Sequence, residues 1–265
     1  MNNNIAAFNA LHQQEQVLCL GNAWDLLSAL VLEQAGFKAI GTTSWGVANT
    51  LGYKDGEKIA FDELLTVAEK IIANVTVPVT IDVEAGFASD AGAIAENVLK
   101  IADLGAAGIN IEDSLKQQAG LQGLQAHCQV LEKIRLTLDS KGYQDFFINA
   151  RTDTYLQLEQ PLAETISRGQ AYVNSGASGL FVPGLTDTDD VRAVVAAIDA
   201  PLNLMSLPNL TDVQALQQLG VKRFSIGNAL SDATIAFMES QAKLLLAQQN
   251  SAGLYDHGEV KTAFK

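Results

Sequence analysis

Cysteine and histidine are scarce in this chain of 265 residues, which contains two cysteines and three histidines. Cys19 and Cys128 alone cannot build a disulfide framework or a four-ligand zinc site. The histidines, at positions 12, 127 and 257, are scattered and show no metal-ligand spacing. Any metal in this protein would therefore be an ion that prefers oxygen ligands.

Positive charge and long apolar runs are also lacking. The chain has 17 Lys and Arg against 30 Asp and Glu, a net charge of −13, so neither nucleic acid nor an anionic membrane is an expected partner. No segment reaches the roughly 18 uninterrupted apolar residues of a membrane span. The first residues lack the basic start and apolar run of a signal peptide. We therefore expect a cytosolic (cytoplasmic) protein.

What the sequence has in quantity is one repeated pattern: a short apolar run, a polar or glycine-containing turn, and a helical segment. The apolar runs are predicted strands that begin at Val17, Ala39, Val77, Gly108, Phe146, Ser178, Pro201 and Arg223. Because they are continuously apolar, they indicate a parallel sheet buried on both faces. Eight such units in about 250 residues favour an α/β fold of the (β/α)8 TIM barrel type over an open doubly wound sheet.

The two ends of the chain carry additional predicted helices. A helix over residues 4–13 precedes the first strand and is expected to plug the bottom of the barrel. A second helix is predicted from Ala229 to Asn250, and the polar tail after it is expected to be either an oligomer arm or a frayed end. No low-complexity segment or linker divides the chain, so residues 1–265 are predicted to form a single domain.

Polar residues occur near the C-terminal ends of the third, fourth and fifth predicted strands, where TIM barrels build their active sites. Successive side chains of a strand point to opposite faces. With Ile81 and Val83 directed toward the helices, the alternation predicts six inward polar side chains: Asp82 and Glu84, Asn110 and Glu112, Asn149 and Arg151. Three carboxylates and one guanidinium are thus expected at one mouth of the barrel.

Three partly buried carboxylates at one place repel each other by several kcal/mol unless a cation balances them. Oxygen-only ligation selects Mg2+, with Mn2+ as a second choice. Arg151 is suited to hold a carboxylate or a developing oxyanion, because its planar fork binds two oxygens at once. The alternative is that these acids cap helices or pair with Arg151 alone.

The loop after the second predicted strand reads GTTSWGVANTLGYKDGE. Small residues around Ser44 and Gly46 would let backbone N–H groups approach a bound carboxylate or carbonyl oxygen. Asp55 lies in a Lys-Asp-Gly turn, and by itself it is only a turn former.

Four stretches in this order, TSWGVANTLGYKDGE, VTIDVEAGFA, INIEDS and INARTD, resemble the isocitrate lyase and phosphoenolpyruvate mutase superfamily. The resemblance extends from about Asn22 to Ala229. It implies a Mg2+-dependent barrel that forms or cleaves a bond beside a 2-oxo acid through a pyruvate-like enolate. It also implies a homo-oligomer, a dimer or a tetramer, that exchanges C-terminal helices between subunits.

The resemblance further implies roles for individual residues. Catalytic roles are expected for Arg151, Asp55 and Glu112. Substrate binding is expected of Ser44, Trp45, Gly46, Asp82 and Arg151. The implied metal ligands are Asp82, which would contact the ion directly, and Glu84 and Glu112, which would act mainly through its waters, as would Asp55.

The chain also departs from the superfamily pattern. Lyases of this superfamily carry a Lys-Lys/Arg-Cys-Gly-His stretch after the fourth strand, where this chain reads DSLKQQAGLQGLQAHCQ. Lys116 is the only basic candidate there, whereas His127 and Cys128 fall in a helical pattern and are predicted to be structural. Val182-Pro183-Gly184 replaces a Pro-Glu pair, and Glu84 stands where Asp is usual. An isocitrate or methylisocitrate lyase is therefore not expected.

The favoured function is carbon–carbon cleavage or decarboxylation of an oxaloacetate-like 2-oxo acid, because loss of CO2 needs no dedicated acid to expel the leaving group. One alternative is phosphorus–carbon chemistry, as in a phosphonopyruvate hydrolase or phosphoenolpyruvate phosphonomutase, which needs cations for a phosphoryl group. A second is a 2-oxo acid-binding protein with little catalysis. A third is a phosphosugar barrel with Gly227 and Asn228 as a phosphate loop.

Overall fold

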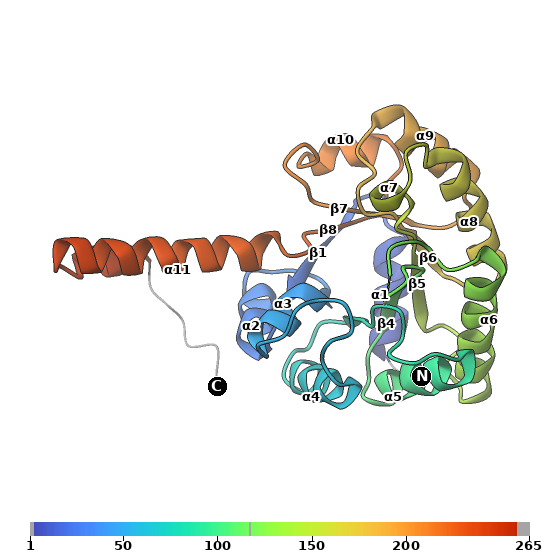
Figure 1. Ribbon diagram of the computed structural model, residues 1–265, viewed down its shortest axis with the longest axis horizontal. Helices are drawn as coiled ribbons and strands as arrows, with labels where there is room; N and C mark the ends of the chain where they lie inside the picture. The colour runs from blue at the N-terminus through green and yellow to red at the C-terminus, as the bar shows by residue number, and fades with distance from the viewer. Residues whose placement is uncertain (1–2, 117, 259–265) are drawn as a thin grey trace.

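The computed structural model describes residues 3–116 and 118–258, and in them eight parallel strands close into a barrel in chain order (Figure 1). The strands are β1 Leu18–Ala23, β2 Ile40–Thr42, β3 Val79–Asp82, β4 Gly108–Glu112, β5 Phe147–Arg151, β6 Gly179–Phe181, β7 Leu202–Met205 and β8 Arg223–Ser225. Leu18 pairs with Arg223, which joins the last strand to the first. The predicted TIM barrel and all eight predicted strands are confirmed.

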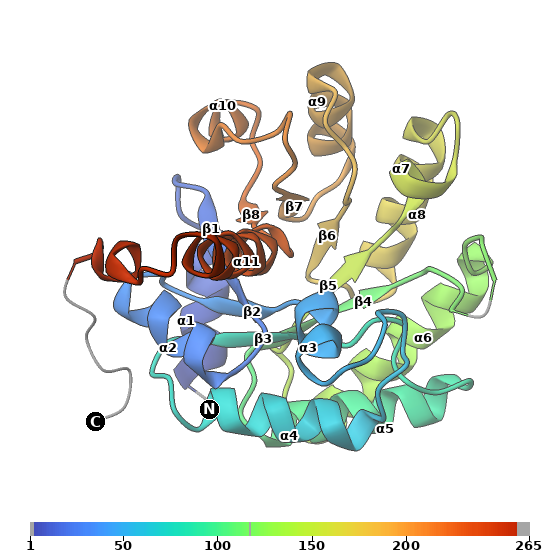
Figure 2. The same cartoon turned by 60° about the vertical axis from the view of Figure 1, so that its left-hand side comes forward.

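Helices surround this barrel, as the second view shows (Figure 2). They are α1 Asn3–His12, α2 Leu26–Gln34, α3 Ser44–Thr50, α4 Phe61–Ile72, α5 Ala91–Asp103, α6 Leu124–Ser140, α7 Thr154–Gln157, α8 Leu162–Asn174, α9 Thr188–Ala197, α10 Val213–Gln218 and α11 Ala229–Gln248, followed by a short 3-10 helix, η1 Ala252–Tyr255. Strand residues such as Ile81, Ile109 and Ile148 are fully buried. The core therefore lies between the strands and the ring of helices, as the continuously apolar strands predict.

The bottom of the barrel is covered by α1. Phe8 is fully buried and meets the ring of Phe147, the first residue of β5, edge-to-face at 5.4 Å between centroids. His12 stacks on the same ring at 4.2 Å. Burial, together with the nearby Arg223, lowers the pKa of His12 to about 3, so the imidazole is neutral. The helix predicted over residues 4–13 thus takes the expected position.

The long C-terminal helix α11 projects away from the barrel (Figure 1). Of its residues, Ser231 alone is buried. Its exposed large apolar side chains are Leu230, Ile235, Phe237, Met238, Leu244, Leu245 and Leu246. Across the part of the chain that the structure describes, no helix combines the length and apolar character needed to cross a membrane. The predicted polar tail lies outside the described residues from position 259 onward.

Candidate active site at the barrel mouth

Three of the six predicted inward residues, Asp82, Asn110 and Arg151, line a cavity of about 170 Å3 at the C-terminal ends of the strands. Its lining residues come from all eight strands and from the loops after β2 and β8: Asn22, Thr42, Thr43, Ser44, Trp45, Asp55, Asp82, Asn110, Arg151, Phe181, Met205, Ser225, Gly227 and Asn228. Because a TIM barrel places catalytic groups at this end, the cavity is the candidate active site. Its size suits a molecule of a few carbon atoms.

Arg151, at the end of β5, is held in one orientation by carboxylates. Its Nη1 lies 2.9 Å from Glu112 Oε2, while its Nε and Nη2 donate to the two oxygens of Asp153 at 2.6 and 3.0 Å. Phe181 lies under the guanidinium, with 5.6 Å between Cζ and the ring centroid. Burial lowers the pKa of Arg151, but Glu112 and Asp153 outweigh it and hold the pKa above its ordinary value. The side chain is thus a fixed positive charge that lines the cavity.

Asp82, the last residue of β3, lines the same cavity. Its backbone N–H donates to Thr42 Oγ1 at 2.8 Å, and its Oδ1 accepts the Glu84 N–H at 3.3 Å. Burial raises the pKa of Asp82 above its ordinary value, against the lowering influence of Arg151 and Lys116. The carboxylate therefore lies in a poorly hydrated place, and a cation bound beside it would stabilise its charged form.

Glu84 lies beyond the end of β3, in a loop with an unusual backbone. Glu84, Gly86 and Phe87 have φ angles of 48°, 106° and 57°, in a region that side chains other than glycine rarely adopt. Glu57 holds the loop, because its Oε1 accepts the Ala85 and Phe87 N–H groups at 3.1 and 2.8 Å. In return, Glu84 Oε2 accepts the Glu57 N–H at 2.8 Å. This exchange, rather than strand alternation, places the Glu84 carboxylate.

Lys116 joins Glu84 to Glu112. Its Nζ donates to Glu84 Oε2 at 2.9 Å and forms a short ion pair with Glu112 Oε1. Burial raises the pKa of both glutamates, whereas Lys116 lowers it. Burial lowers the pKa of Lys116 itself, but the two carboxylates outweigh it and hold that pKa above its ordinary value. The Lys116 ammonium therefore pairs with two predicted metal ligands, Glu84 and Glu112, and Glu112 pairs with Arg151 as well.

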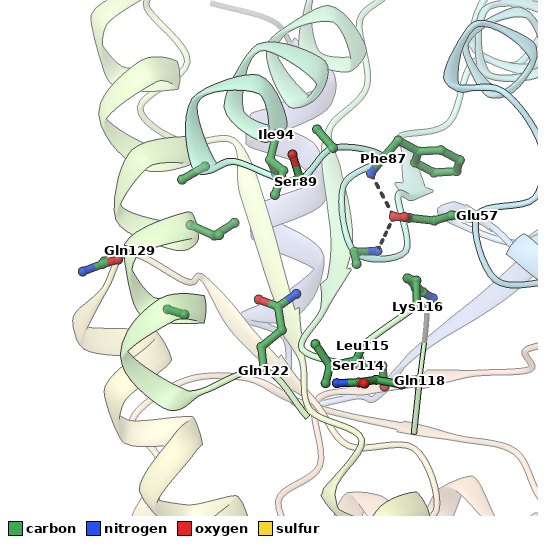
Figure 3. A pocket seen from close by; sticks show the side chains of 15 residues that line it. Glu57, Phe87, Ser89, Ile94, Ser114, Leu115, Lys116, Gln118, Gln122 and Gln129 are labelled. Atoms are coloured by element: carbon green, nitrogen blue, oxygen red, sulfur yellow. Dashed lines mark hydrogen bonds between the residues drawn. The ribbon is translucent and has the colours of Figure 1, made fainter. Parts of the chain in front are cut away.

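A second and larger cavity, of about 740 Å3, lies against Lys116. It is bounded by the loop after β3, the start of α5, the loop after β4 and α6. Figure 3 shows Glu57 and Lys116 on one side of it and Gln129 on the other. Its lining is mostly uncharged, with Gln118 and Gln122 among the polar groups.

A buried network behind the site was not predicted from the sequence. Asp113 is fully buried; its Oδ1 accepts the Asp153 N–H at 3.1 Å, and its Oδ2 accepts from Arg168 Nη1 at 3.1 Å. Tyr172 Oη and Thr152 Oγ1 donate to the same Oδ2, both at 2.7 Å. This network fixes Asp153, which in turn orients Arg151. The only sequence signal was the place of Asp153 two residues after Arg151.

The substrate-binding residues predicted around the second loop are only partly gathered. Ser44 and Trp45 line the small cavity, and so does Asp55 in its turn. The Gly46 N–H points to Thr43 Oγ1 at 3.5 Å as part of the cap of α3. A Cβ at Gly46 would lie 2.7 Å from the Cβ of Trp24, so glycine here serves close packing. The substrate contacts of Ser44, Trp45 and Gly46 and the catalytic role of Asp55 stay predictions.

Two other sequence interpretations are resolved by local geometry. The N–H of Gly227 donates to Asn22 Oδ1 at 3.0 Å, and so does the N–H of Ile226 at 2.9 Å. These amides are engaged, which weakens the phosphate-loop alternative. His127 and Cys128 are buried on α6, so they are structural, as predicted.

A divalent ion such as Mg2+ requires several oxygen donors around one point. Within residues 3–116 and 118–258, no three His, Cys, Asp or Glu side chains are grouped to hold a metal. Lys116 stands between two of the predicted ligands, Glu84 and Glu112. The cluster nevertheless holds more carboxylates than cations, since Arg151 and Lys116 stand beside Asp82, Glu84, Glu112 and Asp153, and Arg223 is a further cation near Asp82. An excess of carboxylate oxygens fits a hard divalent cation. Asp82, which lines the cavity, has the oxygen chemistry that such an ion needs.

Comparison with known proteins gives a match over residues 8–246 to the family described as phosphoenolpyruvate phosphomutase. The 2-methylisocitrate lyase of Escherichia coli K12 is 33% identical over 214 residues, which cover 79% of this chain and 70% of the relative. An oxaloacetate decarboxylase of a Bradyrhizobium species is 28% identical over 233 residues, which cover 85% and 80% of the two chains.

Among solved structures, a Burkholderia cenocepacia protein whose suggested role is that of a phosphonomutase superposes with a TM-score of 0.87. It is 34% identical, and the alignment covers 91% of this chain and 99% of that one.

Proposed function

Since the chain belongs to the phosphoenolpyruvate phosphomutase family, we propose that it is a Mg2+-dependent enzyme that cleaves a carbon–carbon bond of a small 2-oxo acid. The preferred reaction is decarboxylation or cleavage of an oxaloacetate-like substrate through a pyruvate-like enolate. One observation carries the proposal: the fixed guanidinium of Arg151 and the buried carboxylate of Asp82 line the same cavity of about 170 Å3. The substrate would supply an anion beside Arg151, and its metal would supply a cation beside Asp82.

Arg151 is the group that would bind the substrate's oxygens. Glu112 and Asp153 fix its guanidinium before any ligand arrives, so little orientational entropy is lost on binding. Its charge would stabilise the negative charge that develops on an enolate oxygen, the kind of contribution that dominates many enzymes. Ser44 and Trp45, at the start of α3, would hold the other end of the substrate.

Asp82 would hold Mg2+ directly, and Asp55, Glu84 and Glu112 would hold its waters. When bound, Mg2+ supplies Lewis-acid polarisation of the 2-oxo group. Mn2+ has the same ligand preference and would serve as a substitute.

The side chains of the loop after β4 favour CO2 as the leaving group. His127 and Cys128 are buried in α6. Among the described residues of the loop, the polar side chains that line the larger cavity are Ser114, Lys116, Gln118 and Gln122. Loss of CO2 requires no proton donor at the leaving group, so decarboxylation suits this loop. The oxaloacetate decarboxylase relative supports the same choice.

A panel of 2-oxo acids assayed with and without Mg2+ tests the proposal, with oxaloacetate as the leading candidate. We expect turnover that chelation of the metal abolishes and that Asp82→Ala removes. Full activity in Asp82→Ala would contradict the assignment of the metal. An exposed carboxylate, Asp189, provides the matched control, since Asp189→Ala should leave turnover unchanged.

Phosphorus–carbon chemistry is the second candidate, and the cation Lys116 near the mouth is the observation that favours it. It ranks lower because two carboxylates already engage that ammonium. Release of inorganic phosphate from phosphonopyruvate would reverse the ranking. If neither reaction occurs but Mg2+ with pyruvate raises the melting temperature, the protein is a 2-oxo acid-binding protein with little catalysis.

We also propose that the chain forms a homo-oligomer by exchange of α11 between subunits, and that it works in the cytoplasm. The support is the apolar side chains that α11 exposes, among them Phe237, since patches of this kind mark interfaces. Light scattering should give a dimer or tetramer, and Phe237→Glu should shift it to a smaller species. Leu136→Glu, a charge on the exposed face of α6, is the control. A monomeric wild-type protein would contradict the proposal.

A further inference from the structure

Lys116 lies between two of the carboxylates expected to serve Mg2+. Its Nζ contacts one oxygen of Glu84 and one of Glu112. The two glutamate side chains are 4% and 5% exposed, and that of Lys116 is 17% exposed. Buried carboxylates need a positive partner, and this chain supplies one from its own loop.

We propose that Lys116 is an internal cation that competes with Mg2+ for the oxygens of Glu84 and Glu112. The inference rests on the proposed function, because it takes these two glutamates to serve the metal. An ammonium and a divalent ion a few ångströms apart repel each other strongly in a poorly hydrated site. Binding of the ion and pairing of Lys116 therefore exclude one another at these oxygens.

The loop that carries Lys116 is anchored at its base. Ser114 and Leu121 form an antiparallel bridge, and the Leu115 N–H donates to Gly120 O at 3.0 Å. Ser114 Oγ also donates to Asp153. The base is thus tied to the active site, and the Lys116 side chain extends from beyond it, so exchange needs a change in that side chain rather than in the whole loop.

The larger cavity provides a place for the displaced ammonium. It has a volume of about 740 Å3, adjoins Lys116 and is lined by Gln118, Gln122 and Gln129 among others (Figure 3). Amide oxygens of glutamine accept hydrogen bonds from an ammonium. The displaced ammonium would remain hydrated and partly hydrogen-bonded to these amides, which keeps the exchange reversible.

Titration calorimetry with MgCl2 at constant ionic strength measures the competition. The proteins are the wild type, Lys116→Met, Lys116→Gln and the control Lys243→Met, which removes an exposed lysine on α11. Both neutral variants at position 116 should bind Mg2+ roughly tenfold tighter or more, because the competing charge is gone. Lys243→Met should match the wild type. Lys116→Gln retains hydrogen-bond donors, so it keeps the test open if Lys116→Met does not fold.

The calorimetric outcomes separate this inference from the proposed function. Equal or weaker Mg2+ binding in both variants at position 116 overturns the competition and leaves the metal site in place. Absence of Mg2+ binding in all four proteins overturns the metal-dependent function itself, and the competition with it.

Chemical labelling distinguishes true exchange from a general effect of charge. Wild-type protein is treated with an amine-specific acylating reagent, with and without saturating Mg2+, and labelling is read by mass spectrometry. Exchange predicts that Mg2+ increases the labelling of Lys116 several-fold, because its amine leaves the two carboxylates, while labelling of Lys243 stays constant. Unchanged labelling of Lys116 would show that the ion and the ammonium bind side by side, and would overturn the proposal.

Discussion

The mouth and the bottom of the barrel bury their polar groups in different ways. At the mouth, Asp82, Glu84 and Glu112 are buried beside Arg151 and Lys116. At the bottom, Phe8, His12 and Phe147 form an aromatic cluster, and Phe8 also lies 5.8 Å from the Arg223 guanidinium. The mouth is therefore an assembly of charges and the bottom is a packed core, although both belong to the same eight strands.

Arg223 marks the boundary between the two regions. It is 1% exposed, and its Nη2 donates to Asn110 Oδ1 at 3.2 Å, while Nε and Nη1 lack a hydrogen-bond partner among the described residues. Burial lowers the pKa of Arg223 to about 9, against the raising influence of Asp82. An excess of carboxylates at the mouth and one buried cation below it thus face each other along the barrel axis. We therefore expect substitutions at the bottom to act mainly on stability and substitutions at the mouth to act mainly on activity.

The largest expected effect is on stability, from Phe8→Ala. Removal of this fully buried ring should lower the free energy of unfolding by about 3–5 kcal/mol. Mg2+ binding and turnover should be retained at low temperature, because the site lies at the other end. Urea unfolding measures the first and calorimetry the second. Leu136→Ala, at an exposed position on α6, should be near neutral. Loss of Mg2+ binding in folded Phe8→Ala would show that the two regions are not independent.

Arg151→Met, at the mouth, should instead reduce activity. Loss of the fixed guanidinium should reduce kcat/KM by roughly 10²- to 10³-fold, the usual effect of removing one electrostatic donor. Arg151→Lys should recover little, since an ammonium lacks the planar fork. Steady-state kinetics on the accepted 2-oxo acid measures both, with Arg192→Met, an exposed arginine, as the control. Wild-type kcat/KM in Arg151→Met would remove this residue from the mechanism.

A smaller effect is expected from the buried histidines. Burial lowers the pKa of His127 to about 4. At a pH below the ordinary histidine pKa near 6.5, the unfolded chain therefore binds a proton that the folded protein does not. Stability should therefore fall as the pH drops from about 6.5 to 5, by about 1.4 kcal/mol per unit for each such histidine. In His127→Leu the slope should be shallower, and in His257→Leu, at an exposed position, unchanged. Equal slopes in all three proteins would contradict this origin.

The membership of the superfamily, the barrel and the enzyme class could all be predicted from the sequence, and they are confirmed. Strand alternation correctly brought Asp82, Asn110 and Arg151 to one cavity, because each lies within a strand. It could not place Glu84, which follows the end of β3 with a φ of 48°. The alternation of side chains between faces holds only within the strand.

The contacts of loop side chains also could not be predicted from the sequence. Glu57 and Lys116 act through contacts made across the mouth, and no local pattern encodes such contacts. The spacing of four residues between Glu112 and Lys116 is a helical signal, but this segment is not helical. Asp153 is anchored by Asp113, which is 40 residues away in the chain. Its role depends on the register of β4 and β5.

The most direct test of the mouth as a Mg2+ and 2-oxo acid site is a crystal structure grown with Mg2+ and oxalate, a stable mimic of the pyruvate enolate. The account predicts an ion bound to the Asp82 carboxylate and oxalate in the small cavity, with its oxygens facing Arg151 and Ser44. Oxalate bound elsewhere, or an ion that avoids Asp82 at saturating concentration, would contradict it.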